Sequence, residues 1–460
     1  MNARGRLLVV GAAVTMAIAA AVVVTRSTGR TSTQWDPRIE PIARFVERTR
    51  GLRFEHPVEV RLGPPADAVP IAGPARPADT DDSGTAELAG ELRALGLATG
   101  DVDLSPAVTP DPVRRVHGLY DPDRDIVFVD TATLTVEARV VLAHELTHAL
   151  QDQRLHLGDL NTRTDRPNDV VRAVSEGDAV VVQAAYLRSL PPDEQTLYEH
   201  DVESESASEI DAVPPVLREE SQFPYVFGET FMLALRAAGG VTAADRAFRD
   251  PPHSEAEILD AQRFLDGAAS EEVRPPETSA PALRPGRPLG QMTLFRMFER
   301  AVGYGAWRAL RGWEGDNGVV FRRDGAVCAA AAVRVQEATV ADFMQAARGW
   351  ALPSGTVERR PDGIVVLERC DPGPAFERPS FDPDPFAVLT LRNKVIGRLL
   401  GAEVPLRLAT CVADQAVGMG GAAAVTALEG DRSETPDAMA AVLRSAEATC
   451  GPSAPAASGR

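Results

Sequence analysis

Apolar residues recur at helical spacing along residues 133–153, TLTVEARVVLAHELTHALQDQ. Positions three and four apart share one face of an α-helix, so this pattern predicts a helix. Thr133 or Thr135 can cap its first turn, and Glu137 suits the positive end of the helix dipole. The central part, 140–150, has no glycine or proline and is apolar around its polar positions. We therefore expect an uninterrupted, buried helix.

The same reading extends to the rest of the chain. Residues 167–190, PNDVVRAVSEGDAVVVQAAYLRSL, predict a second helix, and 118–130, GLYDPDRDIVFVD, predicts two short strands around a DPDRD turn. Residues 111–270 are otherwise mostly helical in pattern, 289–375 alternates helix and strand, and 385–450 is helical. The prediction is an α+β fold: a mostly helical domain with a small upstream sheet, a smaller α/β module and a helical C-terminal segment.

Proline-rich stretches set the expected domain boundaries. EVRPPETSAPALRPGRP is typical of a linker, and GPSAPAASGR of a disordered tail. We expect this division of the chain: 1–30, a signal peptide or signal-anchor; 36–271, the mostly helical domain; 272–288, the linker; 289–375, the α+β module; 385–450, the helical segment; 451–460, the tail.

The N-terminal segment bears on where the protein acts. Arg4 and Arg6 precede Leu7–Thr25, an uncharged apolar run of 19 residues (25 − 7 + 1). A basic start followed by an apolar helix is typical of a signal peptide or of a single-pass anchor, and this length about suffices to cross a bilayer. We favour an anchor in the cell membrane through residues 7–25, with the remaining chain extracytoplasmic. Cleavage of the segment would instead make the protein secreted.

Charge and cysteine content narrow the partners and the compartment. The formal net charge of −18 argues against a nucleic-acid partner, which needs a basic surface. The chain has four widely spaced cysteines, an even number that predicts two disulfides in an exported protein. None of them forms a Cys-x-x-Cys metal motif. Four cysteines can pair in three ways, and we expect the arrangement with two local bonds, Cys328–Cys370 and Cys411–Cys450.

The predicted helix over 133–153 carries two histidines four residues apart. His144 and His148 therefore share a face and can bind one zinc ion. Glu145 lies beside them, where its carboxylate reaches a water activated by the metal more readily than the metal itself. An H-E-x-x-H pattern also occurs by chance, but the uncharged, unbroken flanks favour a dry metal site here.

A catalytic zinc needs a third protein ligand and an open position. The glycine-containing continuation of the metzincin motif is absent after His148. The 167–190 helix offers Glu176, while Asp178 would face elsewhere because two residues differ by about 200° around a helix. Glu176 is favoured by its longer side chain and by Gly177, which would let this helix approach the histidine-bearing helix closely. A solvated acidic patch is the alternative.

VVLAHELTHALQDQ followed by SEGDA resembles the gluzincin zinc metallopeptidases, and the first motif is close to the thermolysin-like form. The resemblance implies a zincin-like fold for the mostly helical domain, one Zn²⁺ per chain bound by His144, His148 and Glu176, and Glu145 as general base. Other stretches resemble a group of exported bacterial and archaeal gluzincins over roughly residues 36–350, namely GLYDPDRDIVFVD, FPYVFGETFMLAL, PPHSEAEIL and GWEGD.

The chain departs from the thermolysin-like pattern at one supporting position. Those enzymes carry an aspartate four residues after the ligand glutamate, where this chain has Val180. The support that a histidine ligand needs would then come from Asp152 or Asp178. A purely surface role is the alternative for both aspartates.

Peptide hydrolysis also requires a binding edge for substrate and a donor for the oxyanion. In related folds the strand before the active-site helix pairs with extended substrate, a role open to Ile126–Asp130, with a purely structural strand as the alternative. Tyr225 is the preferred oxyanion donor, with Tyr186 and His253 as further candidates. Packing is the alternative role for a buried tyrosine.

Together these residues predict an exported, membrane-anchored zinc metallopeptidase acting on peptide or protein substrates, an endopeptidase rather than an exopeptidase. Glu145 would take a proton from water and pass it to the leaving amine, with Tyr225 at the oxyanion. The alternatives are a non-hydrolytic zinc-binding envelope protein with a scaffolding or binding role, and an envelope interaction protein without metal. The intact Glu145 argues against the first, because a structural site needs no base.

Overall fold

The computed structural model describes residues 34–63, 82–102, 104, 118–163, 166–209, 215–377, 381, 384–429 and 449–451. The predicted anchor, 7–25, lies outside these residues, as does the predicted tail apart from its first residue. Among the described helices, none combines the length and apolarity that a bilayer crossing requires. Contacts divide the chain into two compact units: Met1–Asp79 with Asp103–His253, and Thr80–Val102 with Ser254–Arg460.

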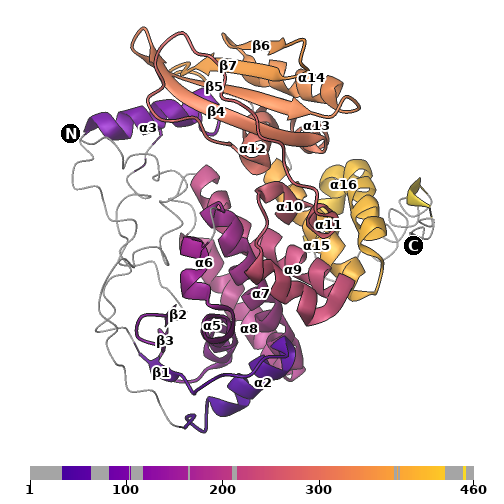
Figure 1. The fold of residues 1–460 in the computed structure, drawn as a ribbon. Coiled ribbons are helices and arrows are strands. Elements are labelled where there is room, and N and C mark those ends of the chain that lie inside the picture. Colours follow the sequence, from indigo (N-terminus) through magenta and orange to yellow (C-terminus); the bar gives the residue numbers. More distant parts are fainter. Residues whose placement is uncertain are drawn as a thin grey trace. The chain divides into compact units, whose positions relative to one another are not determined.

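The first unit is mostly helical and contains a small sheet (Figure 1). Its elements are α2 (Glu40–Arg50), β1 (Glu59–Leu62), β2 (Gly118–Asp121), β3 (Ile126–Val129), α5 (Val136–Leu155), α6 (Leu157–Arg163), α7 (Asn168–Ser189), α8 (Pro192–Glu209) and α9 (Pro215–Arg249). The strand order is β1-β3-β2, so β3 is central, parallel to β1 and antiparallel to β2. The predicted mixed α+β class is confirmed.

Helix α5 forms the centre of this unit. Thr135 caps it, since its hydroxyl accepts a hydrogen bond from the Ala138 amide at 3.1 Å. The helix ends at His156, which has a left-handed backbone with φ 57°. Apolar side chains on all its faces are buried against α2, the sheet and α7, among them Val140, Leu142, Leu146 and Leu150. Burial on every side makes α5 a rigid support for the polar residues that it carries.

Two glycines bring α7 and α9 into backbone contact. A Cβ atom at Gly177 would lie 2.2 Å from the carbonyl carbon of Gly228, and one at Gly228 would lie 2.2 Å from the carbonyl oxygen of Ala173. The sequence predicts that Gly177 allows close approach to the histidine-bearing helix. That expectation was wrong: the partner is α9, because Gly177 lies on the face of α7 that packs against Gly228.

Gly228→Ala is expected to destabilise the first unit, by about 1–3 kcal/mol or more, because the atom in the way belongs to backbone and cannot swing aside. The matched control is Gly401→Ala, at the end of α15, where an added Cβ meets nothing within 4 Å. That change is expected to be neutral or to stabilise by up to about 1 kcal/mol. Thermal unfolding of both variants measures the difference, and equal midpoints would contradict the close α7–α9 contact.

The second unit combines a four-stranded antiparallel sheet with helices (Figure 1). The strand order is β4-β5-β7-β6. Its elements are α3 (Asp82–Leu95), α10 (Glu255–Leu259), α11 (Ala261–Asp266), α12 (Gln291–Val302), α13 (Gly305–Leu310), β4 (Trp313–Arg323), β5 (Ala326–Val335), α14 (Val340–Ala351), β6 (Thr356–Arg359), β7 (Val365–Cys370), α15 (Pro385–Gly401) and α16 (Leu406–Glu429).

Two segments lie elsewhere than the predicted domain boundaries imply. Helix α3, which lies within the range 36–271, belongs to the second unit: Trp350 Nε1 donates to the Leu95 carbonyl at 2.6 Å, and Arg369 Nε donates to the Ala94 carbonyl at 3.0 Å. The proline-rich segment 272–288 runs along β4, to which its residues 283 and 287 are hydrogen bonded. Both placements depend on partners distant in the sequence, which local composition does not reveal.

Both expected disulfides are present. Cys328 on β5 and Cys370 on β7 are direct register partners across two antiparallel strands, and they are bonded. Cys411 in α16 is bonded to Cys450. The four cysteines are thereby all paired, as the sequence predicted.

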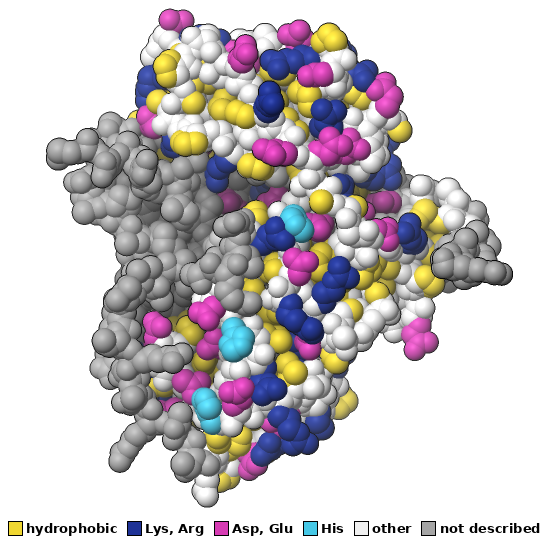
Figure 2. Space-filling view, viewed as in Figure 1, with side chains coloured by type: hydrophobic (Ala, Val, Ile, Leu, Met, Phe, Trp, Pro, Cys, Tyr) yellow, Lys and Arg dark blue, Asp and Glu magenta, His cyan; other side chains and the backbone are white. Residues whose placement is uncertain are grey.

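The described surface mixes charges of both signs. On the face drawn in Figure 2, arginine and acidic side chains are interspersed over each unit, and neither sign forms a broad patch. This face therefore carries no extended basic stripe of the kind that follows a nucleic-acid backbone.

Candidate metal centre

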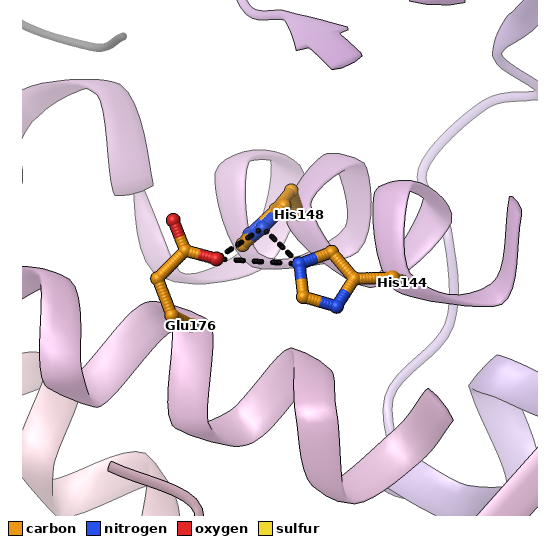
Figure 3. Close-up of side chains that lie close together, drawn as sticks. All are labelled: His144, His148 and Glu176. Atoms are coloured by element: carbon orange, nitrogen blue, oxygen red, sulfur yellow. Dashed lines mark hydrogen bonds and ion pairs between the residues drawn. The ribbon is translucent and has the colours of Figure 1, made fainter. Parts of the chain in front are cut away.

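Three side chains from two helices converge in the first unit (Figure 3). His144 and His148 project from one face of α5, and Glu176 reaches them from α7. Glu176 Oε2 lies 3.2 Å from Nε2 of each histidine, and the two Nε2 atoms are 3.0 Å apart. All three residues are more than nine-tenths buried. Helical spacing supplies the histidine pair, and the packing of α7 on α5 supplies the carboxylate.

This group can hold a metal ion. In a tetrahedral site with metal–nitrogen bonds of about 2.0–2.1 Å, neighbouring donor atoms are about 3.3 Å apart. The observed separations of 3.0–3.2 Å are close to that edge length. Within the described residues, three protein donors gather here, which leaves room for a further ligand. The donor set is therefore compatible with a catalytic rather than a closed structural site.

A glutamine fixes the orientation of His148. Gln151 Oε1 lies 3.0 Å from His148 Nδ1, while Gln151 Nε2 donates to the Ser175 carbonyl at 3.1 Å and to Asp178 Oδ2 at 3.0 Å. Because the amide nitrogen faces two acceptors, the amide oxygen must face the imidazole, and His148 Nδ1 must be the donor. Neutral His148 then presents a lone pair on Nε2 to the centre of the group.

His144 has a similar partner. Its Nδ1 lies 2.9 Å from Gln183 Oε1, and Gln183 Nε2 is 3.3 Å from the Tyr198 hydroxyl. When both Nδ1 atoms donate, two nitrogen lone pairs and a carboxylate oxygen face one point. Such an arrangement is repulsive unless a cation lies between the three atoms, which is the condition for a metal site.

The close approach of these side chains shifts the pKa values of His148 and Glu176. Burial alone would lower the pKa of His148, but the charge and hydrogen bond of Glu176 outweigh it and raise the pKa to about 9. Burial alone would raise the pKa of Glu176, yet the two imidazoles hold it well below its ordinary value. The group therefore favours a positive charge at its centre, whether a proton or a metal ion.

Asp178 does not belong to the group. It is fully buried, and its carboxylate accepts hydrogen bonds from Arg50 at 2.6 Å, from Arg236 at 2.9 Å and from Gln151 at 3.0 Å. The arginines hold the pKa of Asp178 below its usual value against the effect of burial. Asp178 supports His148 only through Gln151. Asp152, the other expected support, instead accepts from the Tyr120 hydroxyl and the Gly158 amide.

Glu145 lies beside the group and against strand β2. It is 8% exposed, and it accepts a hydrogen bond from the Tyr120 backbone. A Cβ atom at Gly118 would lie 2.9 Å from Glu145 Cγ and 2.5 Å from Val141 Cγ1, so only glycine fits there. Burial raises the pKa of Glu145, partly offset by the neighbouring histidines.

The substrate-binding role considered for Ile126–Asp130 does not fit the sheet. Strand β3 is paired on both sides, with β1 and with β2, so it has no free edge. The edge strand next to Glu145 is β2, which among the described residues pairs only with β3. Two short strands were predicted correctly, but their order in the sheet depends on β1, a non-local partner.

The three oxyanion candidates differ in position. Tyr225 on α9 stacks on His144, with ring centroids 6.3 Å apart and an interplanar angle of 25°. Desolvation of its hydroxyl and the nearby charge of Glu176 raise the pKa of Tyr225. Tyr186 packs edge-on against Phe45 and interacts with Arg139, a packing role. His253 follows α9 and is not part of the metal-binding group.

Sequence reasoning missed several residues around the centre. Gln151 and Gln183 support the two histidines, Arg172 lies next to Glu176, and Gly228 sets the distance between α7 and α9. One signal was available for the first: Gln151 follows His148 at i+3, so it shares the face of that histidine. Helical spacing also relates Gln183 and Arg172 to Glu176, since all three lie on α7. Gly228 lies on a separate helix, and no local pattern identifies it.

The chain matches no known family model, no curated protein and no solved structure.

Proposed function

We propose that this protein is an exported zinc metallopeptidase of gluzincin type, with a zincin-like first unit and a membrane anchor at residues 7–25. The main support is one observation: a buried carboxylate that is not a ligand, Glu145, lies beside three convergent metal donors. Zinc is the metal proposed, because two imidazoles and a carboxylate form a known set of catalytic zinc ligands. A zinc ion bound there would act as a Lewis acid and lower the pKa of water in the site.

The chain's own residues would carry the proton transfers. Glu145 would take a proton from the attacking water and return it to the leaving amine. Tyr225, stacked on His144, is the candidate donor to the oxyanion. Gln151 and Gln183 contact the Nδ1 atoms of the two imidazoles, and these contacts would restrict rotation of the rings during the reaction.

The proposed substrate is a peptide or protein segment in extended conformation. Strand β2 lies next to Glu145 and has one strand partner among the described residues. A peptide added along its outer edge would gain main-chain hydrogen bonds while its scissile bond lay near the base. This geometry suits cleavage within a chain.

A non-hydrolytic zinc-binding envelope protein is the second candidate. It would share the three donors, but a structural zinc site is closed by a fourth protein ligand, and the described residues supply three. It also gives no role to Glu145. Burying this carboxylate would then lower the stability of the fold without serving a function.

Metal analysis together with a peptidase assay tests the proposal. The purified chain is expected to hold about one zinc ion and to hydrolyse an unstructured protein substrate. A chelator should abolish hydrolysis, and added zinc should restore it. Metal content near zero after chelator-free purification would exclude the proposal. Bound zinc with no hydrolysis of any peptide mixture would favour the scaffolding role.

A further inference from the structure

Arg172 is a buried cation, two of whose nitrogens have no hydrogen-bond partner among the described residues. It lies on α7, one turn before Glu176, and is 6% exposed. Its Nε and Nη1 atoms are buried and make no hydrogen bond within the described part of the chain. A guanidinium is always charged and carries five N–H donors, so leaving these donors unused in the interior is unfavourable.

The guanidinium lies at the metal centre. Arg172 Nη2 is 3.9 Å from Glu176 Oε1, the carboxylate oxygen turned away from the histidines, and this distance is too long for a hydrogen bond. The side chain of Tyr225 interacts with Arg172, and the same tyrosine ring stacks on His144. Arg172 and Tyr225 thus lie together on one side of the metal centre. They come from α7 and α9, the two helices that are in backbone contact at Gly177 and Gly228.

The formal charges around Arg172 and Tyr225 indicate which kind of ligand group would bind there. With a divalent ion bound and neutral imidazoles, the ion and Arg172 bring three positive charges, and Glu145 and Glu176 bring two negative ones. Among these four groups one positive charge is left over, and it belongs with the unused N–H donors of the buried Arg172. An anionic group on the ligand would neutralise it, and the unused N–H donors would bind its oxygens.

We propose that Arg172, together with Tyr225, forms a subsite for a carboxylate on the substrate, next to the scissile bond. The inference rests on the proposed function, because the metal centre positions the bond to be cleaved. The carboxylate can come from the C-terminus of a peptide or from an acidic side chain. Either source presents two oxygens to the guanidinium fork, which binds planar carboxylates with paired hydrogen bonds.

Binding of two probes to the full chain tests the subsite without relying on turnover. The first probe is a short-chain hydroxamate that carries a carboxylate at its far end, and the second is the same molecule with that carboxylate replaced by a methyl amide. Calorimetry on the zinc-loaded protein is expected to give about 10- to 100-fold tighter binding of the carboxylate probe. Equal affinities would overturn the subsite while leaving the metal centre intact. Binding of neither probe would overturn both.

Two variants assign the preference to Arg172. Arg172→Met should remove the difference between the probes yet still bind the amide probe, whereas Arg172→Lys should keep part of the difference. The control is Arg154→Met on α5, whose side chain is 43% exposed and pairs with Glu55. It should behave as wild type. A preference that persists in Arg172→Met would overturn the assignment.

Peptide cleavage then separates the two sources of carboxylate. Matched peptides differ only in a free or amidated C-terminus, or in an internal Glu or Gln beside the cleaved bond. Faster cleavage of the free-terminus peptide would assign the subsite to a chain end, and faster cleavage of the Glu peptide would assign it to an acidic side chain. No selectivity in either pair would overturn the subsite.

Discussion

The Glu145→Gln variant is expected to retain its metal ion and its fold while losing hydrolysis by about 10²- to 10⁴-fold. The substitution removes the proton acceptor and no metal donor, since the donors are His144, His148 and Glu176. Glutamine has almost the same shape, and its carbonyl oxygen can still accept the hydrogen bond from the Tyr120 backbone. The measurements are kcat/KM on a peptide substrate and zinc content of the same preparation.

Glu137→Gln is the matched control for this experiment. Glu137 lies in the first turn of the same helix, so the control changes the same chemical group on the same element away from the centre. It should keep activity within about twofold, because Glu137 is not a metal donor and lies two turns before His144. Activity of Glu145→Gln near that of the control would mean that another group is the base.

The Glu176→Gln and Asp178→Asn pair is expected to separate metal binding from stability. Glu176→Gln removes the negative charge from the donor group and should weaken zinc binding by more than about 100-fold, beyond the 10- to 100-fold typical of outer partners. Asp178→Asn should retain zinc much better, because its carboxylate contacts Arg50 and Arg236 and not the metal donors. It should instead lower stability, by about 1–3 kcal/mol, since it removes the carboxylate shared by Arg50 and Arg236, although Arg50 keeps its ion pair with Asp245.

Competition with a chelating dye measures the zinc affinity of both variants, and thermal unfolding measures their stability. Gln is the closest replacement in shape at the first position, and Asn at the second, so packing changes are matched. Stronger loss of zinc in Asp178→Asn than in Glu176→Gln would transfer the ligand role to Asp178. That result would break the resemblance to gluzincins at its central point.

The sequence predicted the parts of the centre that depend on one helix. His144, Glu145 and His148 have a fixed relation within α5, and helical periodicity alone places them. Glu176 lies on a second helix, so its position depends on how α7 packs against α5. The longer side chain of Glu176 and the resemblance favoured it over Asp178. The disulfides were also predictable, since short separations favour local pairing in a chain with four cysteines.

The rest depended on contacts between distant segments. Strand β4, WEGDNGVVFRR, carries two glycines, an aspartate and an asparagine in its first half. These residues rarely favour strands, and the strand forms because β5 pairs along its length. The partner of Gly177 lies about 50 residues away on α9, a separation across which local pattern carries no information. The partners of Asp178 are equally remote, with Arg50 separated from it by 128 residues.

The position of helix α3 limits how the protein can be shortened. The chain leaves the first unit at residue 79, contributes α3 to the second unit and returns at 103, before leaving again after 253. A truncation that ends at 253 would carry α3 without its sheet and expose Leu92 and Leu95, which are buried in the intact protein. A fragment that begins at 254 would leave the buried indole of Trp350 without its acceptor. No single cut yields either unit intact, so separate expression of the first unit would require excising 80–102 and joining the flanking ends.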